Sequence, residues 1–146
     1  MPGAPAVRDL LVASSNMTSS VNLLAGWWGF VAGALSGAAL GLAFNRPDFL
    51  GGYDSWRRRL ARLGHIACFG MGILNILFAL SVAARPIEPV LERLGAIAWL
   101  IALVTMPLCC ALAAWRERMR HLFPIPVAAT CAGIATLLLG WWRTGS

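Results

Sequence analysis

The fold is decided by the stretch at residues 54–81, which reads DSWRRRLARLGHIACFGMGILNILFALS. Its first part holds four arginines (Arg57, Arg58, Arg59 and Arg62), and an apolar run that contains His65 and Asn75 follows. A continuous apolar run of about 20 residues is long enough to cross the hydrocarbon core of a bilayer. The arginines ahead of it mark the place where such a helix meets headgroups and water. The pattern is typical of a membrane-spanning helix with a basic flank.

The composition of the whole chain agrees with this interpretation. The 146 residues are 59% hydrophobic and 12% charged, whereas soluble domains carry about 25% charged residues. The length predicts one domain. All 12 basic residues are arginines, which we attribute to a GC-rich bacterial genome, and the net charge is +6. Because these arginines lie in short segments between apolar spans, we expect membrane lipids as partners, and no nucleic acid.

Four membrane spans are predicted, at about residues 22–44, 63–84, 94–114 and 124–142. Prolines and a glycine pair in the connections break the helical pattern between spans. Asp54 or Ser55 is placed to cap the second helix. Since short connections join neighbours, we expect an all-α membrane protein with an antiparallel four-helix transmembrane bundle. Residues 1–20 are expected to form a polar tail, which leaves residues 21–146 as one transmembrane domain.

The first span carries glycine at every fourth position. We interpret Gly29, Gly33, Gly37 and Gly41 as a ridge on which a neighbouring helix packs closely. The neighbour is expected to be another span of the same chain, with a different subunit as the alternative.

The arginines also predict the orientation in the membrane. The first and third connections together hold eight arginines, and the opposite side holds four. The positive-inside rule therefore places these two connections in the cytoplasm and both termini outside, as expected for a bacterial inner-membrane protein. The residues assigned to topology and lipid contact are Arg57, Arg58, Arg59, Arg62, Arg116, Arg118 and Arg120. Docking to an acidic partner surface is the alternative.

His65 is the best candidate for a functional site. An ionisable residue at membrane depth is a functional hypothesis by default, and imidazole ligates haem iron or a chlorophyll magnesium. Helical spacing aligns His65 with Gly72 and Asn75, so the three residues are the candidate cofactor-binding set for haem, chlorophyll or a quinone. The alternative for His65 is interfacial or structural hydrogen bonding, and Asn75 also suits a hydrogen bond between helices.

The chain carries no recognisable catalytic motif. No acid lies at mid-membrane depth, and phosphate loops, nucleophile elbows and paired zinc histidines are missing from the sequence. The four cysteines lie in apolar spans without a compact metal-ligand spacing, so no metal site is predicted. We therefore expect a non-enzymatic accessory subunit of a larger membrane complex, with other integral-membrane subunits as partners. The alternatives are an electron-transfer subunit that uses His65, and a small oligomeric transporter or channel.

Overall fold

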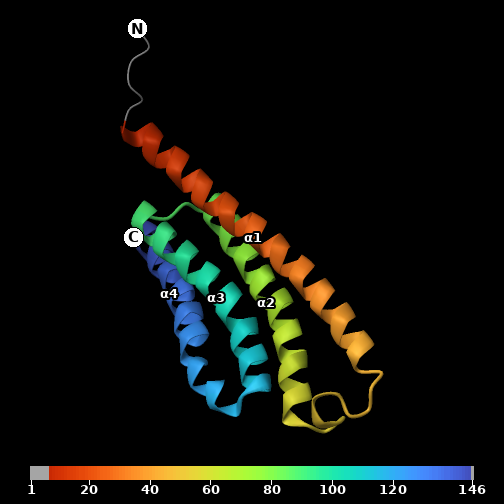
Figure 1. The fold of residues 1–146 in the computed structure, drawn as a ribbon. Helices are drawn as coiled ribbons and strands as arrows, with labels where there is room; N and C mark the ends of the chain where they lie inside the picture. The colour runs from red at the N-terminus through yellow and green to blue at the C-terminus, as the bar shows by residue number, and fades with distance from the viewer. Residues whose placement is uncertain (1–6, 146) are drawn as a thin grey trace.

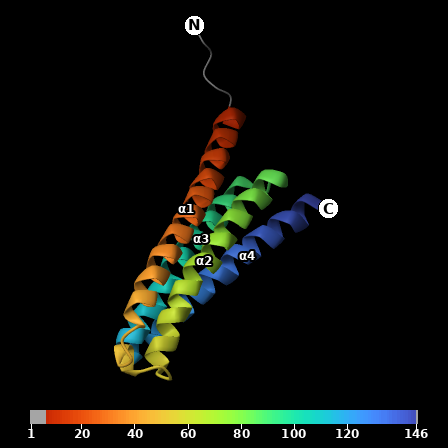
Figure 2. The same cartoon turned by 90° about the vertical axis from the view of Figure 1, so that its right-hand side faces the viewer.

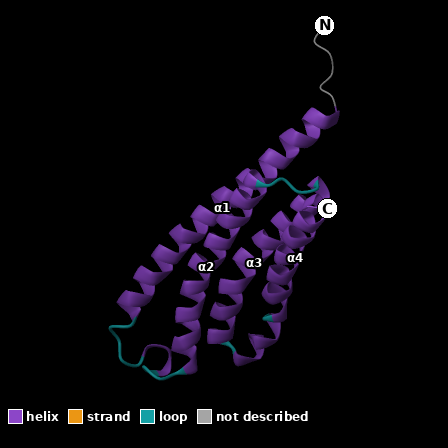
Figure 3. Ribbon diagram, turned by 180° about the vertical axis from the view of Figure 1, so that it is seen from behind, coloured by secondary structure: helices purple, strands orange, loops and turns teal. Residues whose placement is uncertain are grey.

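The computed structural model describes residues 7–145, with side chains from residue 19 onward. The described chain is helical and holds no strand in that range (Figures 1 and 3). Four helices are long and apolar enough to cross a membrane. The long helices are α1 (Val7–Ala43), α2 (Trp56–Ala84), α3 (Pro89–Trp115) and α4 (Pro124–Gly145); the short 3-10 helices η1 (Phe49–Gly51) and η2 (Glu117–Leu122) lie in the connections.

The helix boundaries differ most from expectation at the N-terminus. α1 begins at Val7 rather than near Asn22, so the segment expected to be a polar tail is helical from Val7 on. The first turns of α1 extend beyond the other helices (Figures 1 and 2). α2 begins at Trp56 because the Ser55 hydroxyl oxygen accepts a hydrogen bond from the Arg58 backbone amide at 3.2 Å. α2 ends at Ala84, as predicted.

The four long helices form a row that is open at its edges. α1 packs on α2 and also on α3, α2 packs on α3, and the extensive contacts of α4 are with α3. α1 and α4 therefore lie on opposite sides of the central pair, as Figure 2 shows. In the most apolar 18-residue stretch of each long helix, 17% of the residues of α1 and 11% of those of α4 are buried. The corresponding share is 33% in both α2 and α3.

Glycines of α1 lie close to α2. A Cβ added at Gly29 would lie 3.0 Å from the Cys68 carbonyl oxygen, and one at Gly33 would lie 2.7 Å from the Phe69 ring. A Cβ at Gly37 would overlap the His65 imidazole. Gly41 has no such neighbour within 4 Å. Each four-residue step advances about 40° past a full turn, so Gly41 lies roughly 120° around the helix from Gly29 and leaves the interface.

Glycines of α4 also allow close packing, here against large side chains of α3 and of the residues just before it. Gly133 of α4 faces the indole of Trp99, which is buried, and Gly140 faces Ile87. Phe78 from α2 joins Trp99 in the hydrophobic core, which lies near the connection between α2 and α3. Large side chains of one helix thus fill the space that glycines of the next leave open.

Polar contacts tie the C-terminal end of α4 to the connection between α2 and α3. The Arg85 guanidinium donates to the Trp141 carbonyl oxygen at 3.0 Å, and Arg143 pairs with Glu88 at 3.0 Å. Glu88 is the N-cap residue of α3. These contacts fix the end of the molecule opposite the arginine-rich connections.

Candidate functional site

A cavity of about 400 Å³ lies between α1, α2 and α3, and His65 lines it. Ser36 and His65 are its polar side chains apart from the thiol of Cys68 and the indole of Trp115, and the remaining lining is apolar. The apolar and glycine residues that line it are Ala39, Leu40, Leu50, Ala61, Gly64, Pro107, Ala111 and Ala114. His65, the candidate site residue, thus lines a cavity in the described structure.

The His65 imidazole contacts Ser36 of α1. Nδ1 of His65 lies 3.3 Å from Oγ of Ser36, and the Ser36 hydroxyl also lies 3.0 Å from the Gly33 carbonyl oxygen, to which it donates. Which ring nitrogen of His65 is the donor depends on the tautomer of the imidazole. Phe69 holds the ring edge-on, with 5.3 Å between the ring centroids.

The His65 imidazole is covered on the side that faces α1. A Cβ at Gly37 would lie only 3.1 Å from both ring nitrogens, so the absence of a side chain at Gly37 makes room for the ring. No second histidine lies in the described membrane-length helices to act as the other axial ligand of a bis-histidine haem.

Gly72 and Asn75, the other two members of the predicted cofactor set, do not line this cavity. A Cβ on Gly72 would lie 2.8 Å from the Gly26 carbonyl oxygen, so Gly72 is occupied by helix packing. Asn75 is fully buried, and its side-chain oxygen accepts a hydrogen bond from Nδ2 of Asn22 at 2.8 Å. All three residues lie where α1 meets α2, but among them only His65 lines this cavity.

The amide pair of Asn22 and Asn75 joins three helices. Nδ2 of Asn22 also donates to the Ala96 carbonyl oxygen of α3 at 3.2 Å. Nδ2 of Asn75 donates to the carbonyl oxygens of Trp99 at 3.1 Å and Met71 at 2.9 Å. Asn22 is not among the sequence-predicted site residues, although helical spacing places it on the same face as Gly26, Gly29 and Gly33. That periodicity is the signal that identifies it.

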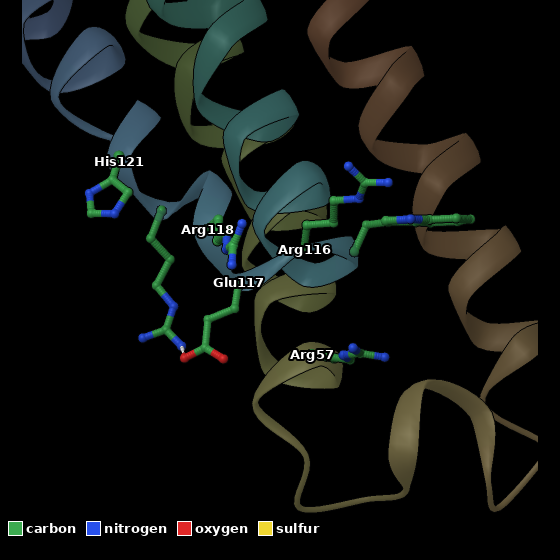
Figure 4. Close-up of a pocket in the computed structure, with 7 residues that line it drawn as sticks. Arg57, Arg116, Glu117, Arg118 and His121 are labelled. Atoms are coloured by element: carbon green, nitrogen blue, oxygen red, sulfur yellow. Dashed lines mark hydrogen bonds and ion pairs between the residues drawn. The ribbon is translucent and has the colours of Figure 1, made fainter.

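A second, basic pocket of about 700 Å³ lies where the end of α3 and η2 approach the start of α2 (Figure 4). Its lining consists of Arg57, Trp115, Arg116, Glu117, Arg118, Arg120 and His121. Glu117 is its one carboxylate, and it is paired with Arg120. The side chains of Arg57 and Arg116 extend to the same side, away from His121 (Figure 4). The structure thus brings together, in one pocket, arginines that lie far apart in the sequence.

Arg58 and Arg62 have a different environment from the other arginines of the predicted lipid-contact set. Arg58 is 4% exposed, and its guanidinium donates to the Phe44 carbonyl oxygen at 2.8 Å and lies 4.3 Å from the Phe44 ring centroid. Arg62 lies over the same ring at 5.2 Å. Arg58 therefore caps the end of α1 and does not present its charge to headgroups, whereas Arg57 and Arg59 are exposed.

The described cysteines are free thiols, and Cys131 is exposed whereas the other three are buried. Among residues that the structure describes, no three His, Cys, Asp or Glu side chains approach closely enough to hold a metal ion. No protein-family model, curated protein or solved structure gives a significant match to the chain.

Proposed function

We propose that the protein is an accessory, non-catalytic subunit of a larger membrane protein complex in a bacterial inner membrane. In this proposal the four helices cross the bilayer as an antiparallel bundle. The arginine-rich connections lie in the cytoplasm and both termini lie outside, because arginine is enriched in cytoplasmic connections. The apolar length of each helix supports the insertion, and the charge difference between the two ends supports the orientation.

The observation that carries the proposal is the outer face of α1. Ala34, Ala38 and Gly41 are exposed and follow one another at helical spacing on this face. A Cβ at Gly41 would meet no atom of the chain within 4 Å. Small residues offer lipid tails little contact surface, but they allow the backbone of another helix to approach. We infer that this face contacts a helix of a partner subunit.

Leucine substitution at two open glycines tests the proposal. Wild-type protein purified from its native membrane in mild detergent should run as a particle heavier than the 15.6 kDa chain and contain other proteins. Gly41→Leu should release those proteins, because the side chain blocks close approach at the outer face of α1. Gly70→Leu is the matched control, since Gly70 of α2 is also open, with no atom within 4 Å of an added Cβ.

Three results would contradict the proposal or move it to an alternative. A lone monomeric wild-type protein contradicts it, and so does an equal effect of Gly41→Leu and Gly70→Leu. A homo-oligomer of this chain would instead support the transporter or channel alternative, for which solute flux in liposomes is the test. The electron-transfer alternative, with a haem, a chlorophyll or a quinone at His65, would be supported by a cofactor that co-purifies with the chain and is lost in His65→Ala.

A further inference from the structure

The basic pocket and the His65 cavity meet at one side chain. Trp115 lines both, and its indole is 77% exposed at the end of α3. Tryptophan is enriched at the depth where headgroups meet hydrocarbon. An arginine-rich hollow thus adjoins an apolar one across the residue type that marks the membrane interface.

The apolar hollow continues farther along α1 and α3. A third cavity, lined by Trp28, Gly29, Leu103 and Val104 among others, shares Cys68 and Pro107 with the His65 cavity. From Val104 to Trp115, α3 rises roughly 16 Å at about 1.5 Å per residue. One leaflet of a bilayer has a hydrocarbon thickness of roughly 15 Å, half of the usual ~30 Å. We call these two cavities together the groove. Its length therefore matches the hydrocarbon thickness of one leaflet, which is the depth that one acyl chain spans.

The charges of the basic pocket call for an anion. The one carboxylate of its lining is paired with Arg120, and the described carboxylates give Arg57, Arg116 and Arg118 no ion pair. Guanidinium groups bind phosphate oxygens with charge-assisted hydrogen bonds. A quinone would suit the apolar groove but has no anionic group for this pocket.

We infer that this chain binds one anionic phospholipid. Arg57, Arg116 and Arg118 hold its phosphate, and one acyl chain lies in the groove between α1 and α3, beside Trp115 and His65. This inference rests on the proposed membrane insertion and orientation, but not on the role as an accessory subunit. The lipid belongs to the leaflet at the arginine-rich end, where basic pockets between helices bind anionic headgroups.

Retention of phosphatidylglycerol tests the phosphate contacts. The full chain is exchanged into nanodiscs of phosphatidylglycerol and phosphatidylcholine, released, and its bound lipid counted by native mass spectrometry. We expect one retained phosphatidylglycerol and a strong preference over phosphatidylcholine. Arg57→Gln with Arg116→Gln should weaken retention by about 25-fold, at roughly fivefold for each arginine. The control, Arg46→Gln with Arg59→Gln, removes the same charge from exposed arginines outside the basic pocket and should retain the lipid.

A second pair of variants tests the acyl-chain groove. Ala111→Phe and Ala39→Phe each fill the groove, one from α3 and one from α1, and should lower lipid retention. Ala135→Phe on the exposed face of α4 is the control and should have no effect. Two groove variants are used so that the result does not depend on one variant that fails to fold. Circular dichroism checks the helix content of each variant.

Four outcomes would overturn the inference. They are equal retention of the two lipids, equal behaviour of the two double arginine variants, displacement of the lipid by millimolar inorganic phosphate with no effect of the groove variants, and extraction of a quinone instead of a phospholipid. Displacement by phosphate would show a site for free anions. None of these results bears on the partner test with Gly41→Leu, so failure of this inference and failure of the proposed function are distinguishable.

Discussion

At the residue scale, the buried amides of Asn22 and Asn75 are the polar centre of the molecule. Both side chains are fully buried, and their amide hydrogens reach backbone carbonyls of α2 and α3. A buried polar group without partners costs free energy, so these bonds favour one register of the three helices over others. The pair therefore specifies how α1 sits on α2 and α3.

A double-mutant cycle measures this role. Asn75→Ala should lower the free energy of unfolding by about 1–3 kcal/mol, because it leaves the Asn22 amide short of a partner. The coupling between Asn22→Ala and Asn75→Ala should be about 1 kcal/mol, as for other hydrogen bonds between membrane helices. Unfolding in mixed detergent micelles gives the four values. Strictly additive single effects would show that the two amides do not act together.

Of this pair, the sequence predicts Asn75 alone. The position of Asn75 in the middle of an apolar span indicates a hydrogen bond between helices. Asn22 does not stand out because it lies at the edge of the predicted span. The sequence does not distinguish the four arginines near the start of α2 from one another. Arg58 is buried because its side chain reaches the Phe44 carbonyl oxygen just after the end of α1. Such tertiary contacts are not encoded in spacing.

At the scale of the helices, glycine phase decides which surfaces meet. Gly26, Gly29, Gly33 and Gly37 face α2, whereas Gly41 has rotated out of the interface. The four-residue spacing in the sequence suggests a straighter ridge than a helix of 3.6 residues per turn allows. The same drift explains why Gly41 is available for a partner.

Alanine substitutions at Gly26 and Gly41 should have opposite effects. A Cβ at Gly26 would lie 2.6 Å from the Gly72 carbonyl oxygen, which belongs to the backbone and moves only with its helix. Gly26→Ala should therefore destabilise the fold by about 1–3 kcal/mol. Gly41→Ala should stabilise it by up to about 1 kcal/mol, because alanine favours the helix and meets no neighbour. Thermal unfolding in detergent compares them, and equal shifts would refute the assigned packing.

At the scale of the whole molecule, the two ends differ in charge and in what they hold. The end with the first and third connections carries Arg58 at the cap of α1, the basic pocket and the opening of the groove at Trp115. The opposite end is closed by the contacts of Arg85 and Arg143. Composition and hydropathy were sufficient to predict four membrane-length helices. The open row and the meeting of two cavities depend on helix rotation, which hydropathy does not specify.

We propose that these helices cross a bilayer with the arginine-rich end in the cytoplasm. Asp54→Cys and Thr144→Cys place a thiol in exposed positions at the two ends, while Ser55 is avoided because its hydroxyl caps α2. In intact spheroplasts, a membrane-impermeant maleimide should label Thr144→Cys alone. Asp54→Cys should become labelled only after the membrane is opened. Labelling of Asp54→Cys in intact spheroplasts, with Thr144→Cys protected, would contradict the orientation, and labelling of both would contradict the membrane-spanning arrangement.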